Sequence, residues 1–433
     1  MNNQTPTSSV LASQHFRTVH VVQAGLRKRY RAEKRFQRLG MTAVACALAF
    51  LAFMFGHIIS KGYTAFQRTV LLLDVYVDPD VVHVGNLDHA DYQSLVKRSL
   101  ERLFPDVRAR QEKRELFRLV SGGAGAVVRA KVLEDTAVIG RTIPVWVPAD
   151  DDVDMVTKGH VDRRSVASEG RLSERSLRWL DTLTSQGRLA KHWNTAFFTS
   201  GDSREPELAG IFGAVAGSFY TLLVTLALSF PMGVAAAVYL EEFAPKNRWT
   251  DVIEVNINNL AAVPSIVFGL LGLAVYLSFF GLPRSSPLVG GLVLTLMTLP
   301  TIIIAGRSSL QAVPPTIRDA ALSVGASPMQ AVFHHVLPLA LPGMLTGTII
   351  GMARALGETA PLLMVGMVAF IVDIPRGFTD PATVLPVQVY LWADSAERAF
   401  VEKTSAAIMV LLAFLIAMNA TAVYLRNRFE RRW

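Results

Sequence analysis

Six long apolar blocks, almost free of charged side chains, constrain this chain more than any other feature of its sequence. A membrane-crossing helix needs roughly 20 mostly apolar residues, because the bilayer core offers no water to satisfy the backbone. Of the 433 residues, 51% are hydrophobic, and the mean hydropathy is +0.34. The sequence therefore predicts an all-α polytopic membrane protein with six transmembrane helices. The blocks are 41–59, 208–240, 255–282, 287–306, 337–372 and 404–425.

The basic residues indicate the orientation of these helices. Residues 1–40 carry eight Lys and Arg against one acid, Glu33, and Lys and Arg resist translocation. We therefore expect a basic cytoplasmic arm at 1–40, a first transmembrane helix at 41–60 and, after six crossings, a basic cytoplasmic tail at 427–433. Beside a membrane span, the arm indicates topology rather than nucleic-acid binding. The tail region agrees with this orientation through Arg426, Arg428, Arg431 and Arg432.

The segment between the first and second spans, residues 61–205, is long enough to form an extracytoplasmic domain. Alternating and β-branched residues predict strands at 70–77, 126–133 and 142–147. Helical spacing predicts helices from Tyr92 onward and over 177–193. We expect an α+β domain inserted between helices 1 and 2.

Two short motifs in this inserted domain suggest no binding site. The glycines of 122–125 lack the spacing of a phosphate-binding loop, so they predict a turn. Asp150, Asp151 and Asp152, with Asp154, lack the Gly and terminal Glu of a calcium loop and predict a solvated acidic turn. Cys46, the only cysteine, lies in the first span, so no internal disulfide or cysteine-metal cluster is expected.

The chain also lacks the motifs of an ATPase or hydrolase. No Gly-Lys dipeptide occurs, so there is no Walker A loop, and no HExxH or GxSxG motif is present. The sequence predicts a protein that is not an enzyme and binds no cofactor or metal. If ATP and Mg drive it, a partner subunit holds them.

The most informative segment is the cytoplasmic loop 306–338. Pro315 suits the first turn of a helix, and Gly325 can supply the left-handed residue that ends it. Ser327 can cap a second helix, with Gln330 completing a capping box, and this helix is expected to end at Pro338. Two short helices joined by a tight turn form a knob suited to a groove on a partner, with Ala320 and Ala321 permitting close approach.

This loop resembles that of ABC importer permeases, a pattern written EAA–x3–G–x9–I–x–L–P. The matching residues are Asp319, Ala320, Ala321, Gly325, Leu337 and Pro338. In that family, the loop enters a cleft of the ATPase subunit and couples hydrolysis to transport. Asp319 replaces the usual Glu, and His335 replaces the usual Ile, which alters the packing there. The alternative is an ordinary capped linker.

Three further segments, 202–211, 263–269 and 353–361, resemble the PstA phosphate permease family. The resemblance extends from about residue 200 to the C-terminus, and the inserted domain looks like an extension carried by one subset of that family. It implies a multi-pass protein of the bacterial inner membrane with a permease domain at 206–426. It also implies phosphate as cargo, a second, homologous permease subunit, two copies of an ATPase subunit and an extracytoplasmic phosphate-binding protein.

Two charged residues, Arg354 and Glu358, lie within the fifth apolar block. A charge inside a span costs at least ~2.5–3.5 kcal/mol on insertion scales, so it normally faces protein or a water-filled path. A spacing of four lets the two residues share a helix face and pair. Arg354 could bind a phosphate oxyanion while Glu358 holds the arginine between passages, or the two could form a purely structural ion pair. In the resembling family, these two residues are linked to phosphate passage.

Other interpretations remain open. Ser218, Thr221, Thr225 and Ser229 recur along the second block and could line the path or form interhelical hydrogen bonds, the second being favoured. The cargo could be another oxyanion, such as molybdate or sulfate. The chain could also be a membrane-anchored sensor or scaffold, although such a protein needs neither the two capped helices nor an intramembrane Arg–Glu pair.

Overall fold

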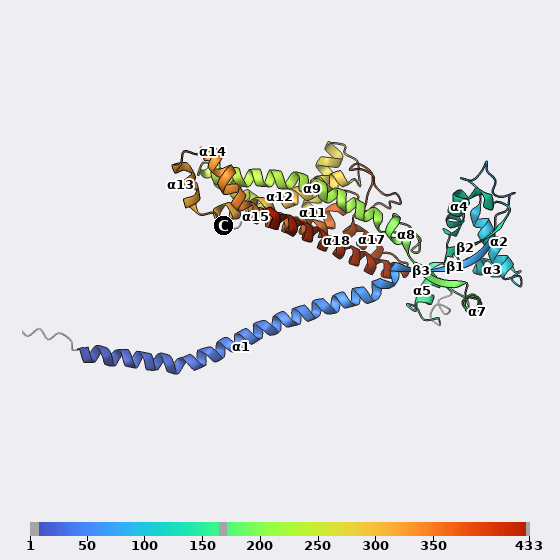
Figure 1. The fold of residues 1–433 in the computed structure, drawn as a ribbon, viewed down its shortest axis with the longest axis horizontal. Helices are drawn as coiled ribbons and strands as arrows, with labels where there is room; N and C mark the ends of the chain where they lie inside the picture. Colours follow the sequence, from blue (N-terminus) through green and yellow to red (C-terminus); the bar gives the residue numbers. More distant parts are fainter. Residues whose placement is uncertain (1–7, 164–170, 430–433) are drawn as a thin grey trace, which may run out of the picture. The chain divides into compact units, whose positions relative to one another are not determined.

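The computed structural model describes residues 8–163 and 171–429 (Figure 1). Its contacts divide the chain into two units, Met1–Ser60 and Lys61–Trp433. The first unit consists of a continuous helix, α1 (Ser8–Gly62), which contains the predicted 41–60 span and ends two residues into the second unit. Arg431 and Arg432 of the predicted basic tail lie outside the described residues.

The inserted domain is built on a three-stranded antiparallel sheet in the order β2-β1-β3. β1 (Gln67–Tyr76) is central and pairs with β2 (Thr142–Pro148) and β3 (Leu189–Trp193). Alternate β1 residues, among them Leu71 and Leu73, are buried against helices that cover the sheet. The predicted α+β domain is confirmed. Its helices are α2 (Tyr92–Leu103), α3 (Arg110–Phe117), α4 (Ala124–Glu134), the 3-10 turn η2 (Thr136–Val138), α5 (Asp151–Lys158) and α7 (Glu174–Ser185).

Two element predictions in this domain were wrong. The strand expected over 126–133 is the helix α4, in which Val128 and Val132 lie four residues apart and both face the core. Their β-branched side chains suggested a strand, but their burial follows helical spacing. The helix expected over 177–193 stops at Ser185, because Gly187 has a positive φ of 69° and the chain then pairs with β1 as β3.

The rest of the second unit is a helical bundle. Four helices are long and apolar enough to cross a membrane: α9 (Phe212–Val238), α12 (Pro287–Gln311), α15 (Leu337–Gly357) and α18 (Ala399–Phe429). The shorter elements are η1 (Tyr63–Phe66), α8 (Thr195–Thr199), η3 (Tyr239–Phe243), α10 (Arg248–Ala261), α11 (Ser265–Gly272), η4 (Leu273–Phe279), α13 (Pro315–Ser323), α14 (Pro328–Ala331), η5 (Val332–Val336), α16 (Ala360–Met364) and α17 (Leu385–Ala393).

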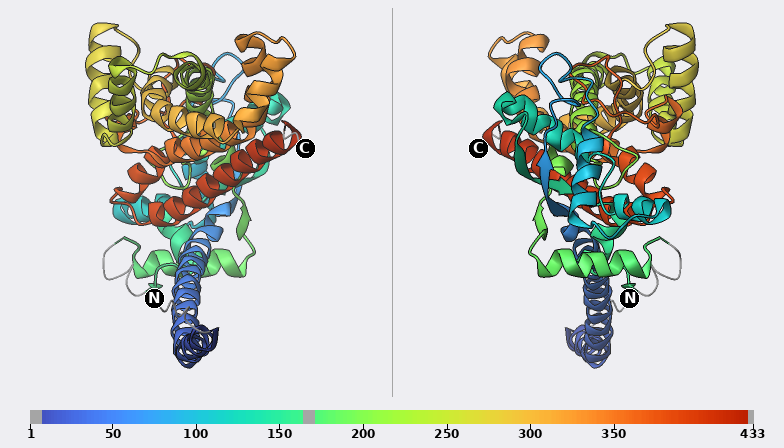
Figure 2. Two further views of the ribbon diagram at one scale, coloured as in Figure 1. Left: turned by 90° about the vertical axis from the view of Figure 1, so that its left-hand side faces the viewer. Right: turned by 90° about the vertical axis from the view of Figure 1, so that its right-hand side faces the viewer.

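The third predicted span is broken. α10 and the helix over α11 and η4 are inclined by 99° (Figure 2), and Pro264 stands between them as the residue before α11. Proline lacks an N–H and disfavours a helical conformation in the residue before it, which explains a break at this position. Within the described residues, five unbroken helices and this bent pair give the six apolar segments that the sequence predicts.

The hydroxyl residues of α9 belong to helix packing. Ser218, Thr221, Thr225 and Ser229 are all buried. Ser218 Oγ accepts a hydrogen bond from Leu385 N of α17 at 2.8 Å, and Thr225 Oγ1 donates to Gly291 O of α12 at 3.3 Å. These contacts support interhelical packing rather than a path-lining role.

We expect Gly217→Ala to destabilise the bundle. A Cβ at Gly217 would overlap the carbonyl oxygen of Thr383, a backbone atom that cannot swing aside, and overpacking of this kind typically costs about 1–3 kcal/mol. Gly351→Ala is the matched control, because its Cβ would meet neighbours only at 3.9 Å. Thermal unfolding in detergent should show a lower Tm for the first variant alone; equal Tm values would contradict this packing.

Candidate functional site

The first half of the 306–338 loop has the predicted geometry. α13 begins at Pro315, and Gly325 follows its end with a positive φ of 90°. Ala326 N then donates to Ala321 O at 3.1 Å, which closes the helix end. The capping box is also confirmed: Gln330 N donates to Ser327 Oγ at 3.3 Å, and Ser327 N donates to Gln330 Oε1 at 2.9 Å.

The second helix of the loop does not end at Pro338. α14 passes through the π-helical turn η5 into α15, giving one helix from Pro328 to Gly357. In the π-turn, Leu337 N donates to Val332 O, five residues back. This wider turn accommodates Pro338, which has no N–H to give to the ladder. The loop is therefore continuous with the span that carries Arg354.

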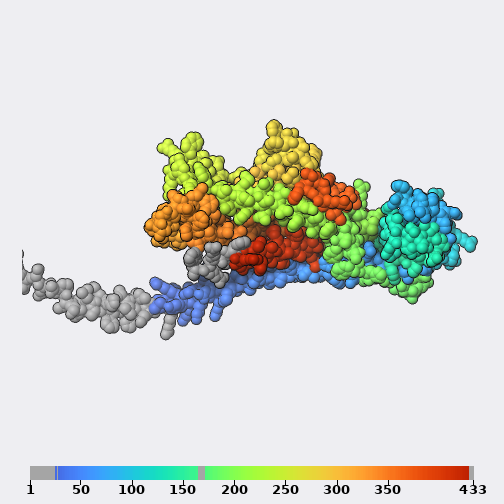
Figure 3. All heavy atoms as spheres, turned by 45° about the horizontal axis from the view of Figure 1, so that its top comes forward, coloured from blue at the N-terminus to red at the C-terminus, as the bar shows by residue number. Residues whose placement is uncertain are grey.

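The loop forms a protrusion at the end of the second unit opposite the inserted domain (Figure 3). Asp319, Ala320 and Gly325 are exposed on it, whereas Ala321 is buried against the bundle. Only one of the two alanines is thus available for close approach to a partner. His335 is exposed, and Leu337 and Pro338 are half-buried at the base. The exposed apolar side chains are Leu322, Phe333, Met329 and Val324, the last 84% exposed.

An ion-pair network that sequence reasoning missed holds α13 to the bundle. Arg318 Nε lies 3.1 Å from Glu242 Oε2, and Arg318 Nη2 bonds the other oxygen, so the contact is bidentate. The Glu242 carboxylate raises the pKa of Arg318, and the guanidinium also donates to Val313 O and Leu310 O. The sequence offers one signal for this pair: Glu242 is an acidic residue just after the end of the second apolar block.

A second arginine extends this network. Arg307, at the end of α12, pairs with Glu241 at 3.3 Å and also with Glu254 of α10. The ends of α9, α10 and α12 and the helix α13 are therefore joined by charge pairs on the side of the loop.

The predicted Arg354–Glu358 contact is present. Arg354 Nε lies 3.6 Å from Glu358 Oε1, and the arginine side chain is 50% exposed although it lies in a span. α15 ends at Gly357, so Glu358 has extended backbone and does not share the helix face as expected. Two of the segments that carry the family resemblance, 263–269 and 353–361, pack against each other. A Cβ at Gly269 would lie only 2.7 Å from Pro361 Cα.

The third segment of the family resemblance, 202–211, leads into the start of α9. Asp202 Oδ1 accepts a hydrogen bond from Trp392 Nε1 at 2.9 Å. A cavity of about 920 Å³ lies between residues 200–208 and the loop 371–381. Leu208, which lines this cavity, also lies against Gly123 of the inserted domain.

The acidic residues of the inserted domain are not the solvated turn that the sequence predicts. Asp150 caps α5 through Asp152 N, and Asp150, Asp151 and Asp152 are half-buried, with carboxylate oxygens within 4.8 Å of one another. Burial, and then the charge of Asp151, raises the pKa of Asp150 to about 8. Burial likewise raises the pKa of the nearby Glu207 to about 7.

Comparison with known proteins finds matches to two family models, each over a different part of the chain. Residues 229–433 match the family described as "Binding-protein-dependent transport system inner membrane component". The matched residues include the helices α12, α15 and α18 of the bundle. Residues 23–167 match a domain of unknown function, DUF3333.

Curated relatives of the permease half include PstA-named proteins. Phosphate transport system permease protein PstA 1 of Mycobacterium tuberculosis is 29% identical over 52% of this chain and 72% of its own length. PstA of Haemophilus influenzae is 28% identical over 54% of this chain and 81% of its own. "Probable ABC transporter permease protein YqgI" of Bacillus subtilis is 34% identical over 39% of this chain, and the chain spans 56% of YqgI's length. Among solved structures, the inward-facing MetNI methionine ABC transporter matches with a TM-score of 0.42 and 20% identity, over 51% of this chain and 98% of that one.

We expect Arg318→Gln to loosen α13 on this permease. Losing the charged partner leaves Glu242 nearly buried and unpaired, a penalty of about 3–5 kcal/mol for a fully buried pair and less here, where Arg318 is part-exposed. Hydrogen exchange of the α13 amides should accelerate at least tenfold. Gln311→Ala is the control, because it removes a single exposed contact to Glu241. Unchanged exchange in the Arg318 variant would show that the ion pair does not fix the helix.

Proposed function

We propose that the chain is a transmembrane permease subunit of an ATP-driven importer and that its cargo is phosphate. The observation that carries the proposal is Arg354, half exposed although it lies in a span. Facing lipid with a guanidinium would be costly, so the exposed side of Arg354 faces a water-filled path or another protein chain. A guanidinium binds phosphate oxygens in bidentate fashion, which suits it to this cargo.

Glu358 gives the site a way to release its ligand. The carboxylate lies 3.6 Å from Arg354 Nε, too long for a tight bidentate pair, and it is less exposed than the arginine. In the absence of an anion, Glu358 neutralises Arg354 and keeps the guanidinium in place. A passing phosphate binds the guanidinium in place of Glu358. The carboxylate then pairs with Arg354 again, which favours release of the anion. The phosphate permease names of the relatives support this cargo.

The continuous helix Pro328–Gly357 gives this site its link to ATP hydrolysis. Two copies of an ATPase subunit, which hold ATP and Mg, dock on the 306–338 loops of this chain and of a second, homologous permease subunit. At 1.5 Å per residue, about 39 Å of helix connects Pro328 to Arg354. Movement of the docked loop therefore moves the arginine, which gives alternating access.

The same arrangement orients the protein in a bacterial inner membrane. The loop and both termini are cytoplasmic, and an extracytoplasmic phosphate-binding protein delivers the anion on the side of the 920 Å³ cavity.

Arg354→Gln should reduce phosphate uptake at least about tenfold, because a hydrogen bond to a charged group contributes roughly 1.5–3 kcal/mol. Uptake of radiolabelled phosphate into cells expressing the complete transporter measures this. Arg354→Lys keeps the charge without the bidentate geometry and should fall between wild type and Gln. Arg426→Gln, on α18 with contacts to Thr346 at 3.3 Å and Asn427 at 3.5 Å, is the matched control.

Co-purification of the partner subunits establishes that the Arg354 variant assembles. Normal uptake by an assembled Arg354→Gln transporter would rule out the pathway role. Competition by unlabelled molybdate or sulfate stronger than that by phosphate would assign the cargo to another oxyanion.

Gly325→Val should uncouple ATP hydrolysis from transport. Its φ of 90° is a left-handed conformation that a β-branched residue adopts only with strain, so the turn presenting Val324 and Met329 would be displaced. Gly325→Asn is the control, because Asn tolerates this conformation. In proteoliposomes, the ratio of phosphate transported to ATP hydrolysed should fall for Val and stay near wild type for Asn; an equal ratio in both would contradict docking through this turn.

A further inference from the structure

A buried ion pair fastens the inserted domain to the last span. Lys158 of α5 has a side chain only 2% exposed, and its Nζ lies 3.1 Å from Glu402 Oε1 of α18, itself 4% exposed. Lys158 Nζ also lies 2.7 Å from Asp154. Lysine and glutamate are almost never this buried unless paired. Separating the two elements would therefore take Lys158 away from Glu402, while Lys158 would keep Asp154 of its own helix.

Hydrogen bonds extend this contact into the sheet and the neighbouring turn. Asp154 Oδ1 accepts from Thr69 N of β1 at 2.8 Å. His160 Nε2 lies 2.7 Å from Thr64 Oγ1 of η1 and 3.9 Å from Glu402 Oε2. The carboxylate of Glu402 thus lies near two groups at the end of α5, Lys158 and His160, and His160 in turn contacts η1.

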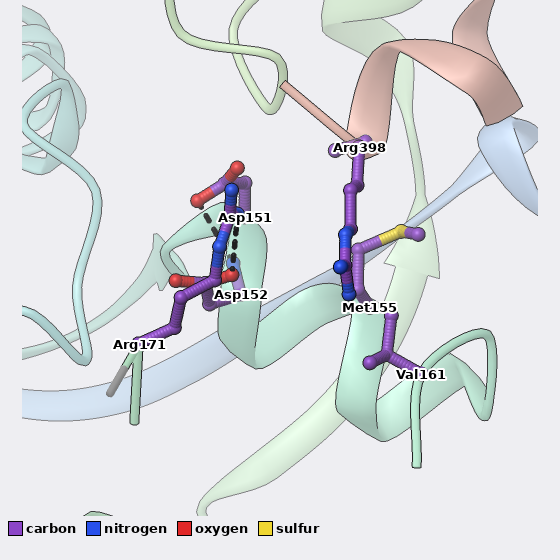
Figure 4. Close-up of a pocket in the computed structure, with 7 residues that line it drawn as sticks. Asp151, Asp152, Met155, Val161, Arg171 and Arg398 are labelled. Carbon is purple, nitrogen blue, oxygen red and sulfur yellow. Dashed lines mark hydrogen bonds and ion pairs between the residues drawn. The ribbon is translucent and has the colours of Figure 1, made fainter. Parts of the chain in front are cut away.

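The rim of the contact is polar and partly exposed. Arg171 pairs with Asp152 at 3.2 Å and with Glu397, in the segment before α18, at 3.7 Å. Figure 4 shows Arg398, from the same segment, extending alongside Met155 of α5. α5 therefore contacts the start of α18 through a buried charged centre and a polar edge.

An apolar core ties the start of α9 into the same assembly. Residues from η1, α8, the start of α9, α17 and α18 form one buried cluster: Ala65, Phe197, Ala209, Ile211, Ala214, Leu385, Trp392, Phe400, Ala406 and Ala407. Asn194, between β3 and α8, donates to Ala65 O at 3.1 Å and caps α8 by accepting from Phe197 N at 3.2 Å.

A third contact explains the glycine-rich turn of the domain. A Cβ at Gly122 would lie 2.7 Å from Glu205 Oε1, and one at Gly123 would overlap the side chain of Leu208. Glu205 and Leu208 belong to the segment that leads into α9, so these glycines permit close approach of the domain to that segment.

We propose that the inserted domain, a domain of unknown function by its family, is a brace that fixes the lead-in of α9 to the start of α18 throughout the transport cycle. This inference rests on one part of the proposed function, namely that the protein undergoes a transport cycle; it does not depend on the cargo. A lid over the 920 Å³ cavity, or a sensor that swings on ligand binding, would have to break the Lys158–Glu402 pair, whereas a brace never does. Access then alternates elsewhere in the bundle, while the outer ends of these two helices move as one body.

The first test measures whether the contact opens. With Cys46→Ser removing the only cysteine, Arg171→Cys and Glu397→Cys place spin labels on either side of the rim. Losing this pair should matter little, because its side chains are 30% and 49% exposed. In the complete transporter, we expect the same single label-to-label distance without nucleotide and with trapped ATP. A second distance in either state would overturn the brace, and this readout does not depend on the cargo.

Cross-linking the same two cysteines with a cleavable bifunctional thiol reagent gives the functional counterpart. A braced transporter keeps phosphate uptake within about twofold of the un-cross-linked double variant. Loss of uptake that reduction restores would identify the domain as a moving part. If the un-cross-linked variant transports another anion or none, the proposed cargo fails, while the distance measurement still decides the brace.

The buried pair itself has a matched set of variants. Lys158→Met should lower the Tm by at least about 4 °C, because it leaves Glu402 buried without this partner. Glu402→Gln should lower the Tm less, because Lys158 keeps Asp154 at 2.7 Å. The double variant should recover most of the loss. If the single changes are additive in the double variant, Lys158 and Glu402 do not hold the domain in place.

Discussion

The cost of leaving a charge without a partner in apolar surroundings governs this structure. Within the described residues, three sets of charge pairs join packed elements: Arg318 with Glu242, Arg307 with Glu241 and Glu254, and Lys158 with Glu402. Each pair joins elements that are distant in the sequence, and breaking a pair costs most where the carboxylate is buried, as in Glu242 and Glu402. The pairs therefore mark which elements move together. One set binds α13 to the ends of α9 and α12, and the other binds the inserted domain to α18.

Between these two fixed ends, the structure offers breaks where change can occur. The third apolar segment bends by 99° between α10 and α11, and the fifth ends at Gly357 beside Arg354. Gly269 of α11 packs directly on Pro361 of α16. A change in the angle at Pro264 would therefore move the residues that follow Glu358 through this direct contact. The arginine at the end of α15 is thus linked to the loop by an unbroken helix and to the third segment by this close contact.

The sequence was sufficient for features that depend on local physics. The length of the apolar blocks predicted the spans, and the capping residues Ser327 and Gln330 and the left-handed Gly325 were identified correctly, because each needs only neighbours a few residues away. It was insufficient where non-local contacts decided the outcome. Lys158 and Glu402 are 244 residues apart, and nothing near either residue indicates the other. β3 is a strand because β1 is available to pair with it, and Pro338 lies within a helix because a π-turn five residues long precedes it.

Arg354 lies in a span but lacks a tight ion pair. Its side chain is half exposed, and its contact with Glu358 is long. When this chain is considered alone, α10 has no buried residue, and Leu270 and Leu271 of α11 are exposed. Under the proposed function, an arginine that is half exposed in a span, together with helices that expose apolar side chains, forms only half of a site. In the proposed importer, a second permease chain supplies the other half, and a path between two such surfaces can hold water and an anion.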